Sequence, residues 1–593
     1  MKWKKTHSCG ELRGKHQGLE TILAGWVDRI RDFGGVLFIT LRDREGLVQA
    51  FIPQEKKELF EEAQKIGIHY VISVRGKVQA RPKENINPDL PTGEIEVEVE
   101  DLEILNTCEP LPLSIDDRDF VSEEVRMRYR YLDLHRRKMQ KALALRHKVC
   151  LESRKFLDQE GFWEVETPIL TKSTPEGARD YLVPSRIHPG CFYALPQSPQ
   201  LFKQLLMIGG VEKYFQICRC FRDEDLRADR QPEFSQIDME MSFVSQDDVL
   251  DVTERMYHHI FKETLGVELP LPFPRLSYQE AKERFGLDKP DLRFGMELQD
   301  ISDLAGQTEF KVFQNALNQG GKVKAIVAKG AAKEYSRKKI DELSRFVGDY
   351  GAKGLAWMKV EKKKITSPIA KFFPEDKLKE LRKRLGLKEG DLVFLVADQE
   401  EVCFAALGHL RNRLAKELGL MDPKKFSILW VVDFPLFTYN EEEERYESEH
   451  HPFTSPHPED IPLLDKDPAK VRSLSYDLVL NGFEVGSGSI RIHRREVQEK
   501  IFQILQLSEE DIEQRFGFFL KALSYGAPPH GGIAPGLDRT VMIMAGYDDI
   551  REVIPFPKTL KASCLMTESP SPVSPQQLED LHISIVAKEN SKK

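Results

Sequence analysis

The sequence predicts a multidomain α+β protein that begins with a small β-barrel of the OB type. The chain has 593 residues, which is room for several domains, each with its own core. Residues 21–105 alternate apolar and polar side chains in short bursts separated by glycine-containing turns, a pattern typical of a Greek-key barrel of about five strands. Further along, residues 214–243 resemble two strands joined by a highly charged loop.

Composition narrows the class of protein. The chain is 40% hydrophobic and 31% charged, as in globular proteins. It has no apolar run long enough to span a bilayer, and MKWKK leads into polar residues, so we expect a cytoplasmic protein without membrane contact. The net charge of −9 argues against a surface that coats nucleic acid broadly, but it allows a local basic face. The eight cysteines lack the paired spacings of disulfides or zinc sites.

The barrel sequence indicates nucleic-acid binding, and the segment after it indicates a hinge followed by a helix. Arg29, Arg31, Phe33, Phe38 and Arg42 combine aromatic with basic side chains, the mixture with which OB barrels bind single-stranded nucleic acid. Each phenylalanine could equally be part of the barrel core. A proline-rich, polar stretch from 108 to 122 indicates a hinge, and the residues from 126 to 162 then predict one long helix.

Residues 214–243 carry the densest charge pattern of the chain. Nine formal charges lie between Arg219 and Glu233, while both ends alternate as strands do. Asp238 and Glu240 are two residues apart and should project from one face of a strand, where they repel unless a metal, an arginine such as Arg222 or a charged ligand lies near. The alternative is a salt-bridged surface hairpin.

Later segments predict further strands and helices. Ser198 can cap a helix that opens at Pro199, so that Gln200 and Lys203 share a face. FSILWVVDFPLF predicts a buried strand. SYDLVLNGFEVGSGSIRIH predicts two strands around a glycine-rich bend, and an apolar helix should begin near Leu537.

Three segments, taken in order, resemble the motifs of one family. GFWEVETPIL after a helix is similar to motif 1 of the class II aminoacyl-tRNA synthetases, FRDE followed by RQPEFSQID to motif 2, and GLDR to motif 3. QPEFSQIDMEMSF and RDFGGVLFITLRDREG resemble the bacterial aspartyl branch in particular. Because motif 1 forms the dimer contact in this family, the resemblance implies a homodimer.

The resemblance also implies a domain plan, in which an antiparallel-sheet catalytic domain of the class II type is interrupted by an α+β insertion. The implied parts are an anticodon-binding OB barrel at 1–108, a hinge at 109–140, a catalytic domain at 141–293 and 427–560, a bacterial-type insertion at 294–426 and a C-terminal extension at 561–593. The lysines of the insertion are either a solvated surface or a contact for the tRNA backbone.

The implied reaction has two halves. L-Aspartate and ATP give aspartyl-adenylate and pyrophosphate, and the aspartyl group then moves to the 3′ end of tRNA(Asp) with release of AMP. Because both first reactants are anions, the site needs positive charge and alignment more than a strong base. The resemblance implies that Arg222 bridges carboxylate and α-phosphate, that Arg539 holds the γ-phosphate, and that Asp477 and Glu484 hold Mg²⁺. It assigns no general base for the transfer.

Further site residues follow from the resemblance alone. The residues implied for aspartate are Glu176, Ser198, Gln200, Lys203, Arg222, Asp238, His450 and Arg491. The residues implied for ATP are Arg222, Asp223, Glu224, Gln231, Phe234, Glu484, Gly536, Leu537, Asp538 and Arg539. The residues implied for the anticodon are Arg31, Phe38, Gln49 and Glu96.

Three alternatives differ in testable features. An asparaginyl enzyme shares the fold, but Lys203 and Arg491 together favour a carboxylate. A tRNA-independent amide ligase would be expected to lack the barrel, and a protein that kept only the barrel function should have lost Arg222 or Arg539. Phe33 and Glu84 align with positions that often hold His and Gly in members that also load tRNA(Asn), so we expect tRNA(Asp) to be preferred.

Overall fold

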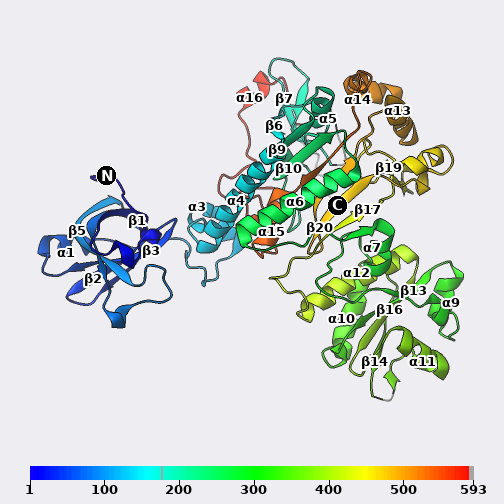
Figure 1. Ribbon diagram of the computed structural model, residues 1–593, viewed down its shortest axis with the longest axis horizontal. Coiled ribbons are helices and arrows are strands. Elements are labelled where there is room, and N and C mark those ends of the chain that lie inside the picture. Colours follow the sequence, from blue (N-terminus) through cyan, green and yellow to red (C-terminus); the bar gives the residue numbers. More distant parts are fainter. Residues whose placement is uncertain (175–177, 363, 587–593) are drawn as a thin grey trace. The chain divides into compact units, whose positions relative to one another are not determined.

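The computed structural model describes residues 1–174, 178–362 and 364–586 (Figure 1). The chain forms two compact units: Met1–Lys141 with Cys564–Glu568, and Ala142–Ser563 with the rest of the tail. Among the described residues, no helix is both long enough and apolar enough to cross a membrane.

The first unit contains the predicted barrel. Its five strands close in the order β1-β2-β3-β5-β4, and β3 pairs with β5 in parallel. Side chains alternate along each strand, so that Leu23 and Val27 of β1 lie fully inside. The elements are β1 (Glu20–Asp32), β2 (Val36–Asp43), β3 (Gly46–Pro53), α1 (Lys57–Ala63), β4 (Val71–Ala80) and β5 (Ile95–Asn106). The OB prediction is confirmed.

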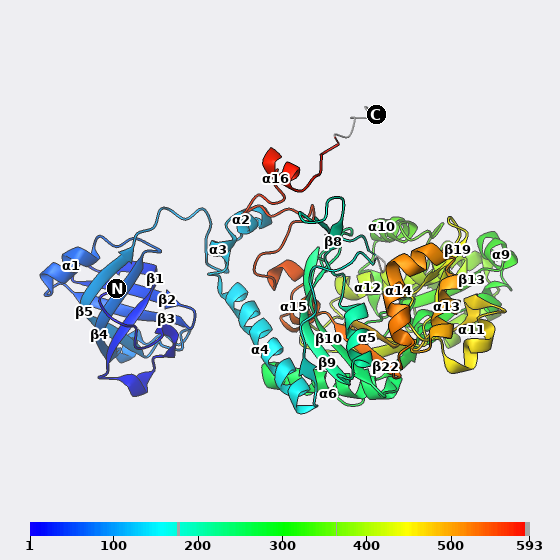
Figure 2. The ribbon, with the colours of Figure 1, turned by 90° about the horizontal axis from the view of Figure 1, so that it is seen from above.

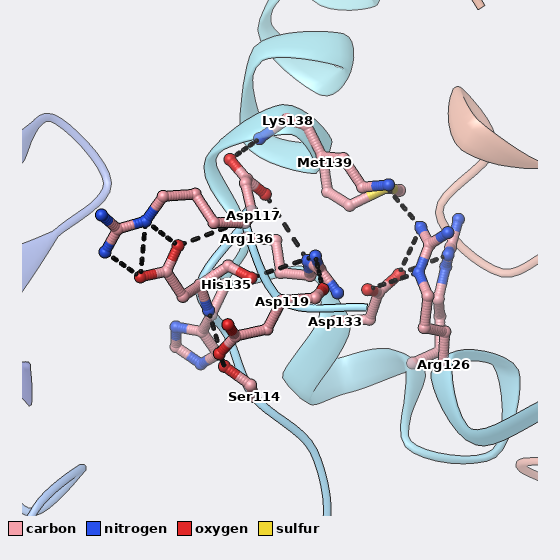
Figure 3. A network of polar contacts seen from close by, with 12 residues as sticks. Ser114, Asp117, Asp119, Arg126, Asp133, His135, Arg136, Lys138 and Met139 are labelled. Carbon is pink, nitrogen blue, oxygen red and sulfur yellow. Dashed lines mark hydrogen bonds and ion pairs between the residues drawn. The ribbon is translucent and has the colours of Figure 1, made fainter. Parts of the chain in front are cut away.

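The segment after the barrel differs from the prediction of one long helix. It forms α2 (Glu123–Arg128), α3 (Arg130–Asp133) and α4 (Arg137–Gln159). The first break lies at Tyr129, whose ψ of 44° is not helical. The physical reason is Asp133, which is fully buried and accepts hydrogen bonds from Arg126 at 2.8 Å and Arg130 at 2.6 Å. Figure 3 shows the Arg126 side chain directed toward Asp133. A buried carboxylate needs such charged partners, and the broken helix brings both to it.

A cluster of rings packs His135, in the link between α3 and α4, on the barrel. The ring of His135 lies 4.7 Å from that of Trp26 and 4.8 Å from that of His69, measured between centroids. Arg42 donates to the backbone oxygen of His135 at 3.5 Å and lies 3.3 Å from Nδ1 of His69. Burial, and then the Arg42 charge, lower the pKa of His135 to about 4 and also lower the pKa of His69.

This cluster should make the barrel unit less stable in acid. The unfolded chain takes up a proton on His135 near pH 6.5, whereas the folded protein does so only near pH 4, so the free energy of unfolding falls as the pH drops between these values. We expect a loss of about 1 to 2 kcal/mol at this partly exposed site. Urea unfolding of His135→Gln at pH 7.5 and 5 should show a smaller drop than the wild type. His147→Gln, at an exposed position of α4, is the control; an unchanged drop in His135→Gln would contradict the prediction.

The second unit is built on an eight-stranded sheet with the order β11-β17-β20-β21-β22-β10-β9-β6. All neighbours pair antiparallel except at the two edges, β11 with β17 and β6 with β9. The strands are β6 (Trp163–Glu164), β9 (Lys213–Phe221), β10 (Glu233–Ser242), β11 (Arg275–Ser277), β17 (Ile428–Val432), β20 (Ser475–Leu480), β21 (Phe483–Ile490) and β22 (His530–Pro535). The predicted strand–loop–strand at 214–243 is therefore confirmed as β9 and β10.

One face of this sheet is the main core. Ile237 and Met239 of β10 pack there with Val149 of α4, Tyr257 of α6 (Gln246–Leu265) and Val541 of α15 (Leu537–Met544). Figure 2 shows these helices beside the sheet. Asp238 and Glu240 alternate with these residues and point to the other face, as predicted from their spacing. The other elements of this unit outside the insertion are α5 (Gln200–Ile208), α6 (Gln246–Leu265), α7 (Tyr278–Phe285), α13 (Arg495–Ile504), α14 (Glu509–Leu523), α15 (Leu537–Met544), α16 (Pro575–Asp580), β7 (Leu182–Pro184) with β8 (Phe192–Ala194), and β18 (Phe437–Asn440) with β19 (Arg445–Ser448).

Two helix starts can be compared with the sequence. The helix α15 begins at Leu537, as predicted. The helix α5 begins at Gln200, one residue later than expected, and its N-cap residue is Pro199 in place of Ser198. Gln200 and Lys203 still share a face, and both are buried.

An independent five-stranded sheet, β12-β13-β16-β14-β15, lies between α7 and β17 in the chain. Its elements are β12 (Gln299–Asp300), α8 (Ser302–Ala305), α9 (Lys311–Asn318), β13 (Lys322–Ala328), α10 (Arg337–Gly348), β14 (Ala356–Val360), β15 (Ile365–Thr366), α11 (Glu375–Arg384), β16 (Leu392–Asp398) and α12 (Glu400–Glu417). This arrangement agrees with the predicted insertion, whose limits at 294 and 426 stay a prediction.

The two ends of the insertion meet the same turn of the main sheet. Arg411 of α12 is buried and donates to the backbone oxygens of Asp291 at 2.8 Å and Phe294 at 3.0 Å. Asp291 also lies against Gly482, in the turn between β20 and β21. At the other end, Ser427 and Asn481 of that turn exchange two hydrogen bonds of 2.8 Å.

Candidate active site

A pocket of about 470 Å³ opens on the face of the main sheet opposite the core. It brings together residues from both sides of the insertion. The predicted site residues that line it are Ser198, Gln200, Lys203, Arg222, Glu224, Gln231, Phe234, Asp238, His450, Asp477, Glu484, Arg491, Gly536, Asp538 and Arg539. Asp223 and Leu537 do not line it: Asp223 is exposed near Arg179, and the Leu537 side chain lies in the core. Glu176 lies outside the described residues.

The floor of the pocket is a buried quartet of charges. Lys203 Nζ lies 2.6 Å from Asp238 Oδ1 and 3.3 Å from Glu240 Oε2. Arg491 binds Glu240 through two bonds, from Nε at 2.9 Å and from Nη2 at 3.1 Å. Each of the four side chains is at most 2% exposed. Lys203 and Arg491 are therefore the cations that compensate the two carboxylates. The sequence had suggested Arg222 as a possible partner, but Arg222 does not contact them.

The two carboxyls of the quartet titrate differently. Burial raises the pKa of Asp238, and Lys203 offsets this only in part. At Glu240, burial also favours the neutral form, but Arg491 and then Lys203 outweigh it and lower the pKa. Asp238 Oδ2 has no hydrogen-bond partner among the described residues. Because an unpaired buried acceptor is costly, this oxygen suits a donor that arrives with a ligand.

The adjacent histidines face different groups. Nε2 of His450 lies 3.3 Å from Asp477 Oδ1, and although burial opposes it, this contact raises the pKa of His450. His451 Nε2 lies 2.7 Å from Arg491 Nη1 and accepts a hydrogen bond from it, because a guanidinium can only donate. Burial and the Arg491 charge lower the pKa of His451 well below its usual range.

The resemblance implied the pair His450 and His451 for the aspartate pocket, with His450 as the preferred residue. Both histidines line the pocket, and His451 is the one that contacts Arg491. Adjacent residues in a loop carry no periodic signal that tells which one faces a distant strand. The missing information is the bridge between Thr454 and Arg491, which sets this loop against the end of β21. Gln236 and Ser487 also line the pocket and were not singled out.

Two arginines lie at the other end of the pocket. The Arg222 guanidinium lies 5.1 Å from the Phe234 ring centroid. Arg539 donates from Nη1 to the backbone oxygen of Glu484 at 2.5 Å and from Nη2 to Asp229 Oδ2 at 3.1 Å. In both arginines Nε is buried without a hydrogen-bond partner among the described residues. These donors suit anionic ligand groups.

Two side chains predicted to contact the nucleotide bind other groups of the protein. Gln231 exchanges hydrogen bonds with the backbone of Lys558, donating at 3.0 Å and accepting at 2.7 Å. Glu224 pairs with Arg230 at 3.3 Å. Their roles toward a nucleotide stay a prediction.

Asp477 on β20 and Glu484 on β21 are close enough to affect each other. The charge of Asp477, followed by burial, raises the pKa of Glu484. Within the described chain, no group of three or more His, Cys, Asp or Glu side chains forms a ready-made metal site. Mg²⁺ is commonly held by one or two carboxylates and completed by water and phosphate, so this pair fits a magnesium ion that arrives with a nucleotide.

The predicted anticodon residues lie on neighbouring barrel strands. Arg31 pairs with Phe38 between β1 and β2, and Gln49 Nε2 donates to Glu96 Oε2 at 2.8 Å. Phe38 points away from the core, since Leu37 and Ile39 on either side are buried. Phe33 is 71% exposed, and its ring lies 5.9 Å from that of Phe38. This surface suits stacking of single-stranded bases.

Comparisons with known proteins agree with this geometry. The family described as class II tRNA synthetases (D, K and N) matches residues 122–560, and the OB-fold nucleic acid binding domain matches residues 21–105. The aspartate–tRNA ligase of Geobacillus kaustophilus is 56% identical over 588 residues, 99% of this chain and 100% of the relative. The aspartate–tRNA(Asp/Asn) ligase of Caldanaerobacter subterraneus subsp. tengcongensis is 57% identical over 583 residues, 98% of each chain.

A solved structure shares the fold. The asparaginyl-tRNA synthetase of Pyrococcus horikoshii, complexed with asparaginyl-adenylate, aligns with a TM-score of 0.59 at 19% identity, covering 94% of this chain and 98% of that one. At this identity the likeness concerns the fold alone. The sequence prediction of a class II catalytic fold joined to an OB barrel is confirmed.

Proposed function

Because this chain belongs to the class II tRNA synthetases of the D, K and N group, we propose that it is an aspartate–tRNA ligase. It activates L-aspartate with ATP and transfers the aspartyl group to the 3′ end of tRNA(Asp), releasing AMP and pyrophosphate. The observation that carries the choice of amino acid is the buried quartet of Lys203, Asp238, Glu240 and Arg491. The relatives that align with nearly the whole chain support this choice, because they are named as aspartate–tRNA ligases.

The quartet selects aspartate by charge. The substrate side-chain carboxylate brings a negative group to Lys203 and Arg491, and its ammonium brings a donor to the unpaired Oδ2 of Asp238. Asparagine would bring a neutral amide to two buried cations, and lysine would add a third cation. A mismatch of this kind in a dry site costs several kcal/mol, or a factor of about 10⁴ in specificity.

The arginines align the two anions. Arg222 lies beside Phe234, on which the adenine stacks, and its guanidinium bridges the α-carboxylate and the α-phosphate. A carboxylate oxygen attacks the α-phosphorus, the bond to the bridging oxygen breaks, and pyrophosphate leaves without a proton transfer. Arg539 binds the γ-phosphate at the leaving end. When bound to Asp477 and Glu484, magnesium supplies positive charge for the phosphate oxygens.

The proposal includes a homodimer in the cytoplasm, where tRNA and ATP are available. The segment from α4 to β6 and the loop after it expose several large apolar side chains, which is the pattern of a surface that meets a partner. These residues are Leu151, Trp163, Ile169 and Leu170. The barrel surface around Phe38 binds the anticodon.

The proposal is tested by exchange of labelled pyrophosphate into ATP and by charging of tRNA transcripts. Exchange should require aspartate, stop with EDTA, and run at least about 1,000-fold slower with asparagine or lysine. Charging should be faster with tRNA(Asp) than with tRNA(Asn). The reason is that this chain has Phe33 and Glu84 at the two positions where members that load both tRNAs often have His and Gly. Equal charging would place the chain with relatives named for both tRNAs, and exchange driven equally by asparagine would refute the proposed amino acid.

A further inference from the structure

Arg146 of α4 joins three elements behind the pocket. Its Nη1 forms an ion pair with Asp538 Oδ1, and its Nη2 donates to Ser235 Oγ at 3.1 Å. The second carboxylate oxygen of Asp538 accepts the backbone N–H of Ser235 at 2.6 Å. Asp538 is 1% exposed, and the Arg146 side chain is 17% exposed. The three residues form a closed triangle between α4, β10 and the start of α15.

Ser235 and Asp538 themselves line the pocket, and each is next to a residue that the proposed function assigns to ATP. Ser235 follows Phe234 in β10, and Asp538 precedes Arg539 in α15. Because side chains alternate along a strand, Phe234 shares the face of β10 that carries Asp238, whereas the Ser235 hydroxyl is directed to Arg146 on α4. Asp538 lies in the first turn of α15, where a carboxylate is stabilised by the helix N-terminus. The triangle thus fixes the backbone of the two segments that carry the nucleotide contacts.

This geometry changes the interpretation of Asp538. The sequence resemblance placed it among the ATP-binding residues, yet both of its carboxylate oxygens are taken by donors of the protein. A carboxylate without a free cation beside it would also repel phosphate. Its contribution to ATP binding therefore passes through Arg539 and the start of α15.

We propose that Arg146 is a positioning residue of the ATP site, holding Phe234 and Arg539 in register through Ser235 and Asp538. The inference rests on the proposed binding of ATP in this pocket and adds a group on α4 that touches neither substrate. The inference also predicts different effects on the two substrates. The aspartate quartet is built from α5, the middle of β10 and the end of β21, and none of its members contacts Arg146 in the described structure.

The test compares substrate affinities in Arg146→Met, Arg146→Lys and Asp538→Asn. We expect Arg146→Met to raise the Kd for ATP, measured by equilibrium dialysis, and the KM for ATP in exchange at least 10-fold, with the KM for aspartate within twofold. Arg146→Lys should fall between, because an ammonium keeps the charge opposite Asp538 but cannot reach both partners. Arg255→Met is the control: Arg255 of α6 makes a two-bond pair with Glu160, at 2.5 and 3.0 Å, away from the pocket.

The double variant Arg146→Met/Asp538→Asn separates positioning from general loosening. If the pair acts as one unit, ATP affinity in the double variant is no weaker than in the worse single variant. Multiplied losses, an equal rise of both KM values, or an ATP Kd of folded Arg146→Met within twofold of wild type would each overturn the inference. If Arg146→Met does not fold, Arg146→Lys and Asp538→Asn give the same comparison. A wild type that fails to bind ATP would instead refute the proposed function.

Discussion

Replacement of Arg222 by alanine is expected to lower kcat/KM for ATP in aspartate-dependent pyrophosphate exchange about 1,000-fold, or about 4 kcal/mol. The guanidinium lies over Phe234 at 5.1 Å, and its Nε has no hydrogen-bond partner among the described residues, so its donors are available to ligands. The reaction joins two anions, and a preformed cation that touches both lowers their repulsion most as the new bond forms.

Two further variants define the effect of Arg222. Arg222→Lys should recover only part of the rate, because a point charge cannot bridge two acceptors as a planar guanidinium does. Arg227→Ala, at an exposed position in the same loop, is the matched control and should exchange within twofold of wild type. Retention of more than a fifth of the wild-type rate by folded Arg222→Ala would contradict the proposed role.

Lys203→Met is expected to reduce both stability and aspartate activation. Lys203 is 1% exposed and lies between Asp238 and Glu240, so its removal leaves two carboxylates buried with only Arg491 to compensate them. Breaking a buried ion pair by removing one partner costs about 3 to 5 kcal/mol. The unfolding free energy from urea titration should fall by this amount, and exchange with aspartate should be lost.

A second substitution separates the two effects of Lys203. In Lys203→Met/Asp238→Asn one buried negative charge is also removed, so most of the stability should return. Exchange should stay low, because the cation that meets the substrate carboxylate is still missing. An unfolding free energy of Lys203→Met within about 1 kcal/mol of wild type would show that the quartet is not a network of coupled charges.

Local patterns predicted the parts of this molecule whose causes are local. Period-two alternation placed Asp238 and Glu240 on one face of a strand, and the structure finds them there. The same pattern predicted the barrel strands, whereas the exposed role of Phe38 came from the family resemblance alone. These features depend on neighbours two residues apart, which the sequence shows directly.

Features set by distant partners were harder to predict. The helix before the main sheet is broken because buried Asp133 accepts hydrogen bonds from both Arg126 and Arg130. Helix propensity describes single residues and does not include such contacts. The partner of Asp538 is Arg146, 392 residues away in the chain, so the sequence did not show this ion pair, and Asp538 was assigned to ATP by the resemblance alone. His451 faces Arg491 through a loop whose register the sequence does not carry.

The path of the chain around the insertion has a structural consequence. Arg411 binds the segment that leads into the insertion at Asp291 and Phe294, and Ser427, after the insertion, is bound to Asn481. Both ends of the insertion are therefore held at the same turn, the one that joins β20, which carries Asp477, to β21, which carries Glu484. An insertion attached in this way leaves the order of the strands unchanged, and any tilt of the insertion acts on the turn that joins the two strands carrying those carboxylates.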